Sequence, residues 1–337
     1  MVLLEFDSQG TQAMKNNFVG VDLGGTFIKA GVTDASGGVL SRVQVPTGVA
    51  RTGESVAECV AEAAQQAVRE AGLKWADVPA VGVGSPGTID LRAGIVTFCP
   101  NIRGLDGFPL RERISKRIEG IPVVLENDAN AAAKGEQLAG AGRGAHSLVM
   151  FTLGTGIGSG IVIENRVWHG CNDVGSELGH MTINIDGPRC GCGNSGCVEA
   201  YASATAMVRR MREAIAAGTQ SILAEDCDGI TARKIHQAAL AGDVAAHDNI
   251  RETGRYLGVA ISNVLHSFNP EVVVLGGGVT NAGQMLMEPV QEEVNRRTLK
   301  ACLERTEIRF AELGENAGFI GAAGCAMEWA EFPAESV

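Results

Sequence analysis

The sequence has few aromatic residues, few charged residues and no long apolar run. Aromatic residues make up 4% and charged residues 20% of the 337 residues, against 45% hydrophobic residues, which is typical of a soluble globular protein with well-buried interiors. No stretch reaches the ~18 uninterrupted apolar residues of a membrane span. Residues 1–17 indicate a flexible leader without the apolar core of a secretory signal. We therefore expect a cytoplasmic protein with no membrane partner.

Positive charge is also scarce. The chain has 28 Lys and Arg against 39 Asp and Glu, a formal net charge of −11. Such a surface repels phosphate-rich polymers, so we expect no nucleic-acid partner, and a phosphorylated ligand must be held by backbone amides or a metal ion. The 45 glycines are too many for a helical bundle and predict many tight turns between strands. The length is sufficient for two domains, each with its own core.

Three of the nine cysteines lie within eight residues of one another. Cys190, Cys192 and Cys197 follow His180 closely, with glycines at 191, 193 and 196. Three thiolates and an imidazole can surround a zinc ion tetrahedrally, and no open position remains for water, which predicts a structural site. The alternative is a set of ordinary reduced thiols with a hydrogen-bonded histidine, and Cys171 is near enough in sequence to compete as a ligand. An odd cysteine count without a secretory signal disfavours disulfides.

A glycine turn separates the first two strands of a three-stranded meander predicted over residues 18–45. The residues of interest here are Asp22, Gly24, Gly25, Thr26 and Lys29. Bare glycine amides can approach a phosphate, Asp22 can hold Mg²⁺ through water, and Thr26 or Lys29 can contact a phosphate oxygen. The alternative is an ordinary Gly-Gly hairpin.

The same order of strand, glycine turn and strand recurs about halfway along the chain, over residues 148–163. Its turn residues are Gly154, Thr155 and Gly156. This duplication predicts that both turns bind one nucleotide from opposite sides. A third segment, with Gly276, Gly277 and Gly278, follows an apolar strand at 271–275. It is either a flat surface for an adenine ring or a tight connection from strand to helix.

Polar residues follow a buried, parallel-type strand predicted over 121–125. Glu126, Asn127 and Asp128 come next, and an alanine-rich helix follows. Ligands usually bind at the carboxyl ends of strands in α/β sheets. Asp128 is therefore a candidate general base for a sugar hydroxyl, and Asn127 can orient the neighbouring hydroxyls. The alternative is that Asp128 caps the helix.

Hydrophobic periodicity and glycine or proline breaks predict the remaining elements. Helices are expected over 54–71, 109–118, 200–217, 231–241, 245–267 and 316–329, and strands over 80–89 and 307–312. The last helix is expected to return to the first domain.

Six motifs in this order resemble the ROK sugar kinases, within the actin, Hsp70 and hexokinase superfamily. They are Asp22-Leu-Gly-Gly-Thr26, Glu126-Asn-Asp-Ala-Asn130, Leu153-Gly-Thr-Gly-Ile-Gly158, Glu177-Leu-Gly-His180, Cys190-Gly-Cys-Gly-Asn-Ser-Gly-Cys197 with Glu199, and Leu275-Gly-Gly-Gly278. They span nearly all of the chain from Phe18 onward. The cysteine loop preceded by Glu-x-Gly-His is the most specific.

The resemblance implies an α/β, two-domain actin-like ATPase (ribonuclease H-like) fold with duplicated mixed sheets and an interdomain cleft. The expected domains are a smaller N-terminal one, residues 18–127 plus 316–337, and a larger C-terminal one, residues 128–315, with the zinc loop at 180–197. The resemblance further implies ATP and Mg²⁺ at the two glycine turns, structural Zn²⁺, and a homodimer or dimer of dimers.

The resemblance also implies a sugar site with Asp128 as the base. The implied sugar contacts are Asn101, Asn127, Glu177, His180 and Glu199, with the segment around Gly87 and Asn101 lining the 2-position. The expected reaction is phosphorylation of the 6-hydroxyl of glucose, with N-acetylglucosamine or N-acetylmannosamine as alternative substrates. A sugar-responsive transcriptional repressor is disfavoured, because 17 residues before the first strand are too few for a helix-turn-helix. A non-catalytic sugar-binding regulator is a further alternative, against which Asp128 and both glycine turns favour turnover. Ser176 and Ser159 depart from the family pattern. Neither change removes a functional group, so the departures bear on the expected substrate preference and not on the expected reaction.

Overall fold

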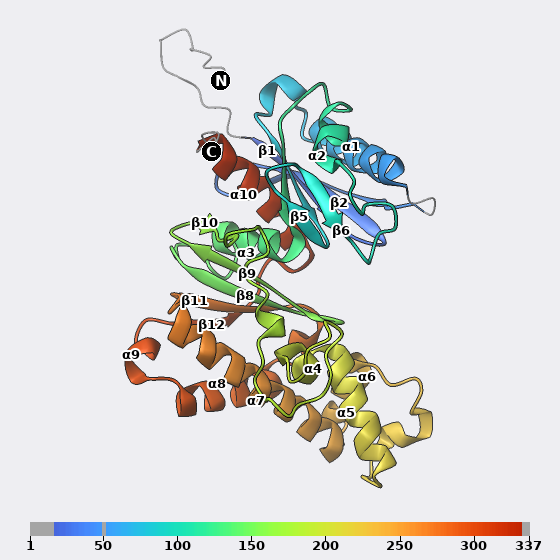
Figure 1. The fold of residues 1–337 in the computed structure, drawn as a ribbon, viewed down its shortest axis with the longest axis vertical. Coiled ribbons are helices and arrows are strands. Elements are labelled where there is room, and N and C mark those ends of the chain that lie inside the picture. The colour runs from blue at the N-terminus through green and yellow to red at the C-terminus, as the bar shows by residue number, and fades with distance from the viewer. Residues whose placement is uncertain (1–16, 49–51, 332–337) are drawn as a thin grey trace. The chain divides into compact units, whose positions relative to one another are not determined.

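The computed structural model describes residues 17–48 and 52–331, and the predicted leader lies outside them except for Asn17 (Figure 1). The strands are β1 (Phe18–Leu23), β2 (Phe27–Thr33), β3 (Val39–Pro46), β4 (Val81–Ser85), β5 (Thr88–Asp90), β6 (Ile95–Phe98), β7 (Val123–Asn127), β8 (Leu148–Leu153), β9 (Ile157–Ile163), β10 (Arg166–Val167), β11 (Val272–Gly276) and β12 (Glu307–Phe310). The helices are α1 (Gly53–Glu70), α2 (Leu110–Ser115), α3 (Asp128–Ala139), α4 (Val198–Ala202), α5 (Ala204–Ala216), α6 (Ala232–Leu240), α7 (Val244–Ser267), α8 (Gln284–Arg297), α9 (Lys300–Leu303) and α10 (Ala317–Glu331).

The described chain forms two compact units. Unit 1 comprises the chain up to His146, Gly160–Gly175 and the chain from Glu312 onward, and unit 2 comprises Ser147–Ser159 and Ser176–Ala311. These limits differ from the predicted domain boundaries, because α3 and residues 160–175 group with unit 1. Helix α3 groups with unit 1 because it packs extensively against α10.

Two five-stranded sheets repeat one strand order. The first has the order β3-β2-β1-β4-β7 and the second β10-β9-β8-β11-β12. In the first, β1, β2 and β3 form the predicted antiparallel meander, while β1, β4 and β7 are parallel. In the second, β8, β11 and β12 are likewise parallel, and β9 pairs with β10 antiparallel. The predicted duplication of a strand, a glycine turn and a strand is therefore confirmed at the level of whole sheets.

Unit 1 places its sheet between α1 and α10 (Figure 1). Side chains alternate between the faces of a strand, so Val19 and Val21 of β1 enter the buried cluster that includes Val56 and Val60 of α1. The intervening Gly20 faces α10, where a Cβ atom would overlap the carbonyl oxygen of Phe319. The missing side chain lets the last helix pack directly on the strand, and this confirms the predicted return of the chain to its first part.

Unit 2 covers its buried strands with long helices. All five residues of β11 are buried, as expected for a central parallel strand. The helices α7 and α8 pack tightly together. The predicted helix over 200–217 is instead two helices, because Ser203 ends α4 and its side chain accepts a hydrogen bond from the Ala206 N–H to cap α5.

Unit 1 also contains a pair of short strands that was not predicted. The strand predicted over 80–89 ends at Ser85, and the chain continues into an antiparallel pair, β5 and β6, that the sequence did not indicate.

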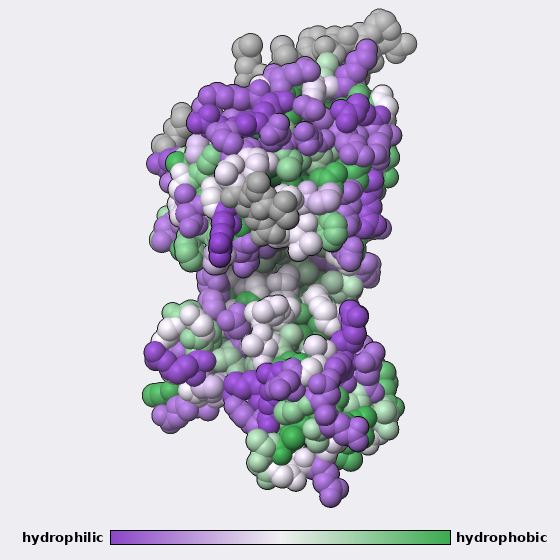
Figure 2. All heavy atoms as spheres, turned by 90° about the vertical axis from the view of Figure 1, so that its right-hand side faces the viewer, coloured by the Kyte–Doolittle hydropathy of each residue, from purple (hydrophilic) through white to green (hydrophobic). Residues whose placement is uncertain are grey.

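The face in Figure 2 shows hydrophilic residues interspersed with small hydrophobic patches. None of the helices within residues 17–48 and 52–331 is long and apolar enough to cross a bilayer.

Candidate active site

The predicted base, Asp128, is the first residue of α3 and is exposed. Asn127 caps this helix, because its Oδ1 accepts hydrogen bonds from the backbone N–H groups of Ala129 (2.9 Å) and Asn130 (3.3 Å). The alternative prediction that Asp128 is the cap is therefore wrong. Its carboxylate lies in the first turn, where the positive end of the helix favours a negative charge.

The predicted sugar residues of unit 1 lie in neighbouring segments. Asn127 Nδ2 donates a hydrogen bond to the backbone oxygen of Gly87 at 3.2 Å. A Cβ atom on Gly87 would overlap the carbonyl oxygen of Phe98, so glycine is required where β4 leads into β5. Because β6 continues into the loop that carries Asn101, the contact between Gly87 and Phe98 joins this loop to Asn127.

Buried Cys99 lies under the Asn101 loop. The N–H of Cys99 donates to Asp106 Oδ1 at 2.6 Å, which closes the loop. Burial raises the pKa of the Cys99 thiol; hydrogen bonds from the N–H groups of Ile102 and Asn101 oppose this, and the Asp106 and Asp128 carboxylates add to it. The Asn101 loop, Gly87, Asn127 and Asp128 are thus neighbours within unit 1.

The first glycine turn is tied down from the side by Thr47. Its N–H donates to the oxygen of Thr26 at 2.9 Å, and its hydroxyl donates to the oxygen of Gly24 at 2.7 Å. A Cβ atom on Gly25 would lie 3.8 Å from the backbone oxygen of Asn101. The turn predicted to bind phosphate therefore borders the loop predicted to bind sugar.

Asp22 and Lys29 face each other across β1 and β2. Burial raises the pKa of the Asp22 carboxyl, and Lys29 partly opposes this. Burial disfavours the charged form of this carboxyl, and a bound divalent cation would favour it. Lys29 Nζ lies 3.3 Å from Glu315, so its ammonium already has an anionic neighbour.

The second and third glycine segments lie at the carboxyl ends of β8 and β11, two neighbouring strands of the second sheet. The parallel strands β8 and β11 pair Thr152 with Gly276, just before the turn of Gly154, Thr155 and Gly156. Gly277 has φ of +90°, and a Cβ atom there would lie 2.5 Å from the oxygen of Leu153. The predicted connection from strand to helix is present, because Gly278 begins a short 3₁₀ helix, Gly278–Ala282.

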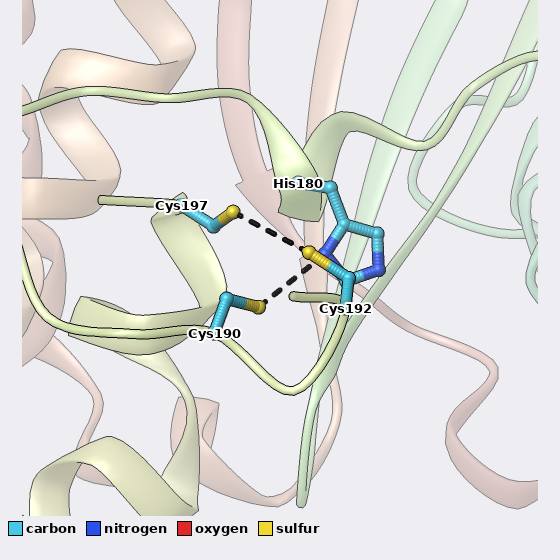
Figure 3. A group of neighbouring side chains, drawn as sticks. All are labelled: His180, Cys190, Cys192 and Cys197. Atoms are coloured by element: carbon cyan, nitrogen blue, oxygen red, sulfur yellow. Dashed lines mark hydrogen bonds between the residues drawn. The ribbon is translucent and has the colours of Figure 1, made fainter. Parts of the chain in front are cut away.

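The four predicted metal ligands come together within unit 2 (Figure 3). Their ligand atoms all lie within 4.8 Å of one another. The Sγ atoms of Cys192 and Cys197 are 3.8 Å apart, and Cys190 Sγ is 3.7 Å from His180 Nδ1. Ligands about 2.3 Å from a zinc ion at tetrahedral angles are separated by about 3.8 Å, so the set fits zinc. Cys171 is not one of this cluster's residues.

The thiols of this cluster influence one another's ionisation. Burial raises the pKa of Cys190 to about 12 and also raises the pKa of Cys197, whereas the backbone N–H of Asn194 lowers the pKa of Cys192. Closely spaced thiolates repel each other, and a bound divalent cation removes that repulsion.

The predicted sugar contacts of unit 2 lie within the cluster or next to its members. His180 turns Nδ1 toward Cys190, while its Nε2 lies 3.8 Å from Glu177. Glu199 accepts a hydrogen bond from the N–H of Ile157 at 2.9 Å and from the Cys190 thiol at 3.5 Å. Glu199 thus joins the cysteine cluster to the second glycine turn, a link that motif spacing does not reveal.

The structure also identifies Glu126 and His169, which the sequence interpretation did not assign to the site. Glu126 is 3% exposed and His169 Nε2 lies 2.7 Å from its carboxylate. A glutamate at the end of an apolar strand was the available signal, because a buried charge needs a partner. The partner lies 43 residues away, and no local pattern identifies it.

Comparison with known proteins agrees with the motifs and the fold. A model of the ROK family matches residues 18–328. The chain belongs to the ROK family. It is 38% identical to the glucokinase of Thermotoga maritima over 320 residues, 93% of this chain and 98% of that protein. This confirms the predicted family.

Two solved structures are similar over almost the whole chain. The ROK hexokinase of Thermus thermophilus is 39% identical, covers 94% of this chain and 99% of its own, and has a TM-score of 0.80. The ROK family glucokinase of Streptomyces griseus, in complex with glucose and AMPPNP, is 37% identical, covers 93% and 99%, and has a TM-score of 0.75. The predicted actin-like α/β fold is therefore confirmed.

Proposed function

We propose that this ROK family member is an ATP-dependent glucose kinase that forms glucose 6-phosphate. The observation that carries the proposal is its similarity to glucokinases over 92–93% of the chain. The local arrangement of Gly87, Asn127 and Asp128 supports it, because these groups suit a sugar and its reacting hydroxyl.

In the proposed reaction, Asp128 accepts the proton of the glucose 6-hydroxyl while the oxygen attacks the γ-phosphorus of ATP and ADP leaves. Phosphoryl transfer depends mainly on positioning and on stabilisation of charge, so one carboxylate base is chemically sufficient. Asn127, Asn101 and Gly87 of unit 1, and Glu177, His180 and Glu199 of unit 2, are the proposed sugar contacts. A sugar hydroxyl both donates and accepts, which suits this mixture of amides, carboxylates and imidazole.

The proposed nucleotide residues are the glycine segments of both units. Gly24, Gly25 and Thr26 present backbone and hydroxyl groups for phosphate oxygens, as do Gly154, Thr155 and Gly156, while Gly276, Gly277 and Gly278 offer a surface for adenine. Mg²⁺, when bound, neutralises phosphate charge, and Asp22 would hold it through water. Lys29 would reach a phosphate by leaving Glu315.

The four-residue cluster is the proposed site of a structural zinc ion. His180, Cys190, Cys192 and Cys197 supply four ligands, so no position is left for catalytic water. The bound ion would fix the imidazole of His180 and the cysteine loop that leads into α4, where Glu199 lies in the first turn. The zinc would thereby order sugar contacts without taking part in the chemistry.

A coupled ADP-release assay tests the reaction with MgATP and glucose, N-acetylglucosamine, N-acetylmannosamine, mannose or fructose. We expect glucose to give the highest kcat/KM. Preference for an acetylated sugar would keep the mechanism and change the substrate. If a folded, zinc-loaded sample releases no ADP with any sugar, a sugar-binding regulator becomes the better interpretation.

The variant Asp128→Asn tests the base. General-base catalysis contributes about 10²- to 10⁴-fold, so kcat should fall by that order while the glucose Kd changes only a few-fold. Asp248→Asn is the control, because Asp248 is a well-exposed carboxylate, with 70% of its side chain accessible, on α7. Near-normal turnover by Asp128→Asn rejects this role for Asp128.

A further inference from the structure

A buried carboxylate lies directly behind the turn that carries Asn127 and Asp128. Glu126 Oε1 accepts hydrogen bonds from the Asn127 N–H at 2.9 Å and from Asn130 Nδ2 at 3.0 Å. Its Oε2 lies 2.7 Å from His169 Nε2. These three hydrogen-bond partners therefore belong to the junction of β7 with α3 and to His169.

His169 is held in turn by the chain that leads toward Glu177. Its backbone oxygen accepts a hydrogen bond from the N–H of Gly175 at 2.8 Å. A Cβ atom on Gly175 would lie 2.8 Å from the His169 carbonyl carbon, so the two backbone segments are in close contact. Glu177 follows Gly175 by two residues, so His169 links two chain segments that carry proposed site residues.

The surroundings of His169 favour its protonated form. Burial alone lowers the pKa of His169, but the hydrogen bond and charge of Glu126, with the charges of Asp173 and Glu328, raise it above its ordinary value. Lys134 Nζ lies 3.1 Å from the carboxylate of Glu328. Cys325, whose thiol pKa is raised well above its ordinary value mainly by burial, is also near Glu126.

Counting charges shows why the imidazolium suits this place. Glu126, Asp173 and Glu328 supply three negative charges and Lys134 one positive charge. A protonated His169 supplies the second positive charge. A buried ion pair stabilises a fold little or no more than an apolar pair of equal volume. Stability alone therefore does not explain the pair of Glu126 and His169, and its position next to Asp128 indicates a role in the site.

We propose that Glu126 and His169 are a positioning pair that holds the Asn127–Asp128 turn in the geometry required for proton transfer from the sugar. This inference rests on the proposed kinase function. The pair acts through the N–H of Asn127 and the side chain of Asn130, not by contact with the reacting atoms. Loss of the imidazole leaves Glu126 Oε2 buried without a donor and allows the turn to shift.

Two substitutions of His169 separate positioning from simple space filling. His169→Leu fills the space without a donor, and His169→Gln keeps a donor. A misplacement of about 1 Å costs about 100-fold in rate, so we expect kcat of the leucine variant to fall ten- to 100-fold with a nearly unchanged glucose KM. The glutamine variant keeps a neutral donor and should recover the part of the loss that does not depend on the positive charge. His247→Leu is the matched control, because His247 is a half-exposed histidine 3.9 Å from the carboxylate of Asp248.

The pH dependence provides a signature that a space-filling role does not predict. The pKa of His169 is raised in the folded protein. Protonated His169 therefore stabilises the folded state fully below the unfolded pKa of about 6.5, and this stabilisation is lost as the pH rises through the folded pKa. The wild-type kcat profile should lose activity through that folded pKa. His169→Gln should lack this step, and an unchanged profile would contradict the role of the imidazolium.

Hydrogen exchange tests the pair independently of catalysis. In His169→Leu, amides over residues 126–131 should exchange faster than in wild type, while His169→Gln and His247→Leu stay near wild type. Unchanged exchange and unchanged kcat in His169→Leu overturn the proposal. A wild type that phosphorylates no sugar would reject the kinase function alone, because exchange still reports on the pair. If the leucine variant does not fold, Glu126→Gln replaces it. We then expect NMR titration to give a lower pKa for His169 than in the wild type, and an unchanged pKa contradicts the proposal.

Discussion

Asn127 combines two tasks that substitutions can separate. Its Oδ1 caps α3 through the N–H groups of Ala129 and Asn130, while its Nδ2 donates to Gly87 and is the proposed sugar donor. Serine is as good a cap as asparagine but has no amide donor, and alanine has neither function. The variants Asn127→Ser and Asn127→Ala therefore isolate the cap from the amide.

The magnitudes follow from these contacts. Loss of the cap costs about 1 kcal/mol, and loss of the hydrogen bond to Gly87 about another 1 kcal/mol. Asn127→Ser should lose about 1 kcal/mol and Asn127→Ala about 2 kcal/mol of the free energy of unfolding. For a domain of about 150–250 residues, the alanine variant should melt roughly 2–4 °C below the serine variant.

Sugar binding should respond differently from stability. Both variants lack the amide donor, and one neutral hydrogen bond is worth about 0.5–1.5 kcal/mol, so the glucose KM should rise by about 2- to 13-fold in both. Thermal denaturation and steady-state kinetics measure the two effects in the same samples. A wild-type glucose KM in Asn127→Ser would refute the sugar contact, and equal melting temperatures for the two variants would refute the cap.

The other predictions concern unit 2. Gly277→Ala should cost at least about 2 kcal/mol in unfolding free energy, because φ is +90° and the Cβ atom meets the backbone of Leu153; Gly278→Ala, with open space around it, should cost under about 0.5 kcal/mol by denaturant titration. Cys192→Ser should lose the bound zinc by elemental analysis, and full zinc content with full activity contradicts a four-ligand site. Glu199→Ala should raise the glucose KM more than the ATP KM. Glu199→Gln should leave the ATP KM unchanged, because the glutamine side chain can still accept the hydrogen bond from the Ile157 N–H. An ATP KM that rises equally in both variants refutes the link between Glu199 and the glycine turn.

Local sequence patterns predicted most of the elements and the cluster of possible metal ligands. The meander, the duplicated strand order, the buried strand before Asp128 and the final helix follow from periodicity and glycine turns. The cluster of His180 and three cysteines lies within one short stretch, so the spacing of possible ligands could be predicted before any fold was known. Family and fold follow from the same motifs and are confirmed.

Contacts between distant segments were not predictable in this way. The sequence interpretation treated Asp128 as either a base or the helix cap, and only the position of Asn127 decides against the cap. The hairpin of β5 and β6 was missed because its strands have three and four residues, too few to show a clear alternation. The link between Glu199 and Ile157 spans 42 residues and depends on how two turns fold together.

Glu199 connects the proposed zinc site to the proposed phosphate turn. One carboxylate oxygen contacts the glycine turn at Ile157, and the other contacts Cys190. Displacement of the cysteine loop therefore also moves a group that supports the proposed phosphate turn. His180 has the same double connection, since its two ring nitrogens face Cys190 and Glu177. We therefore propose that a metal that orders this one loop would affect the proposed sugar and nucleotide residues together.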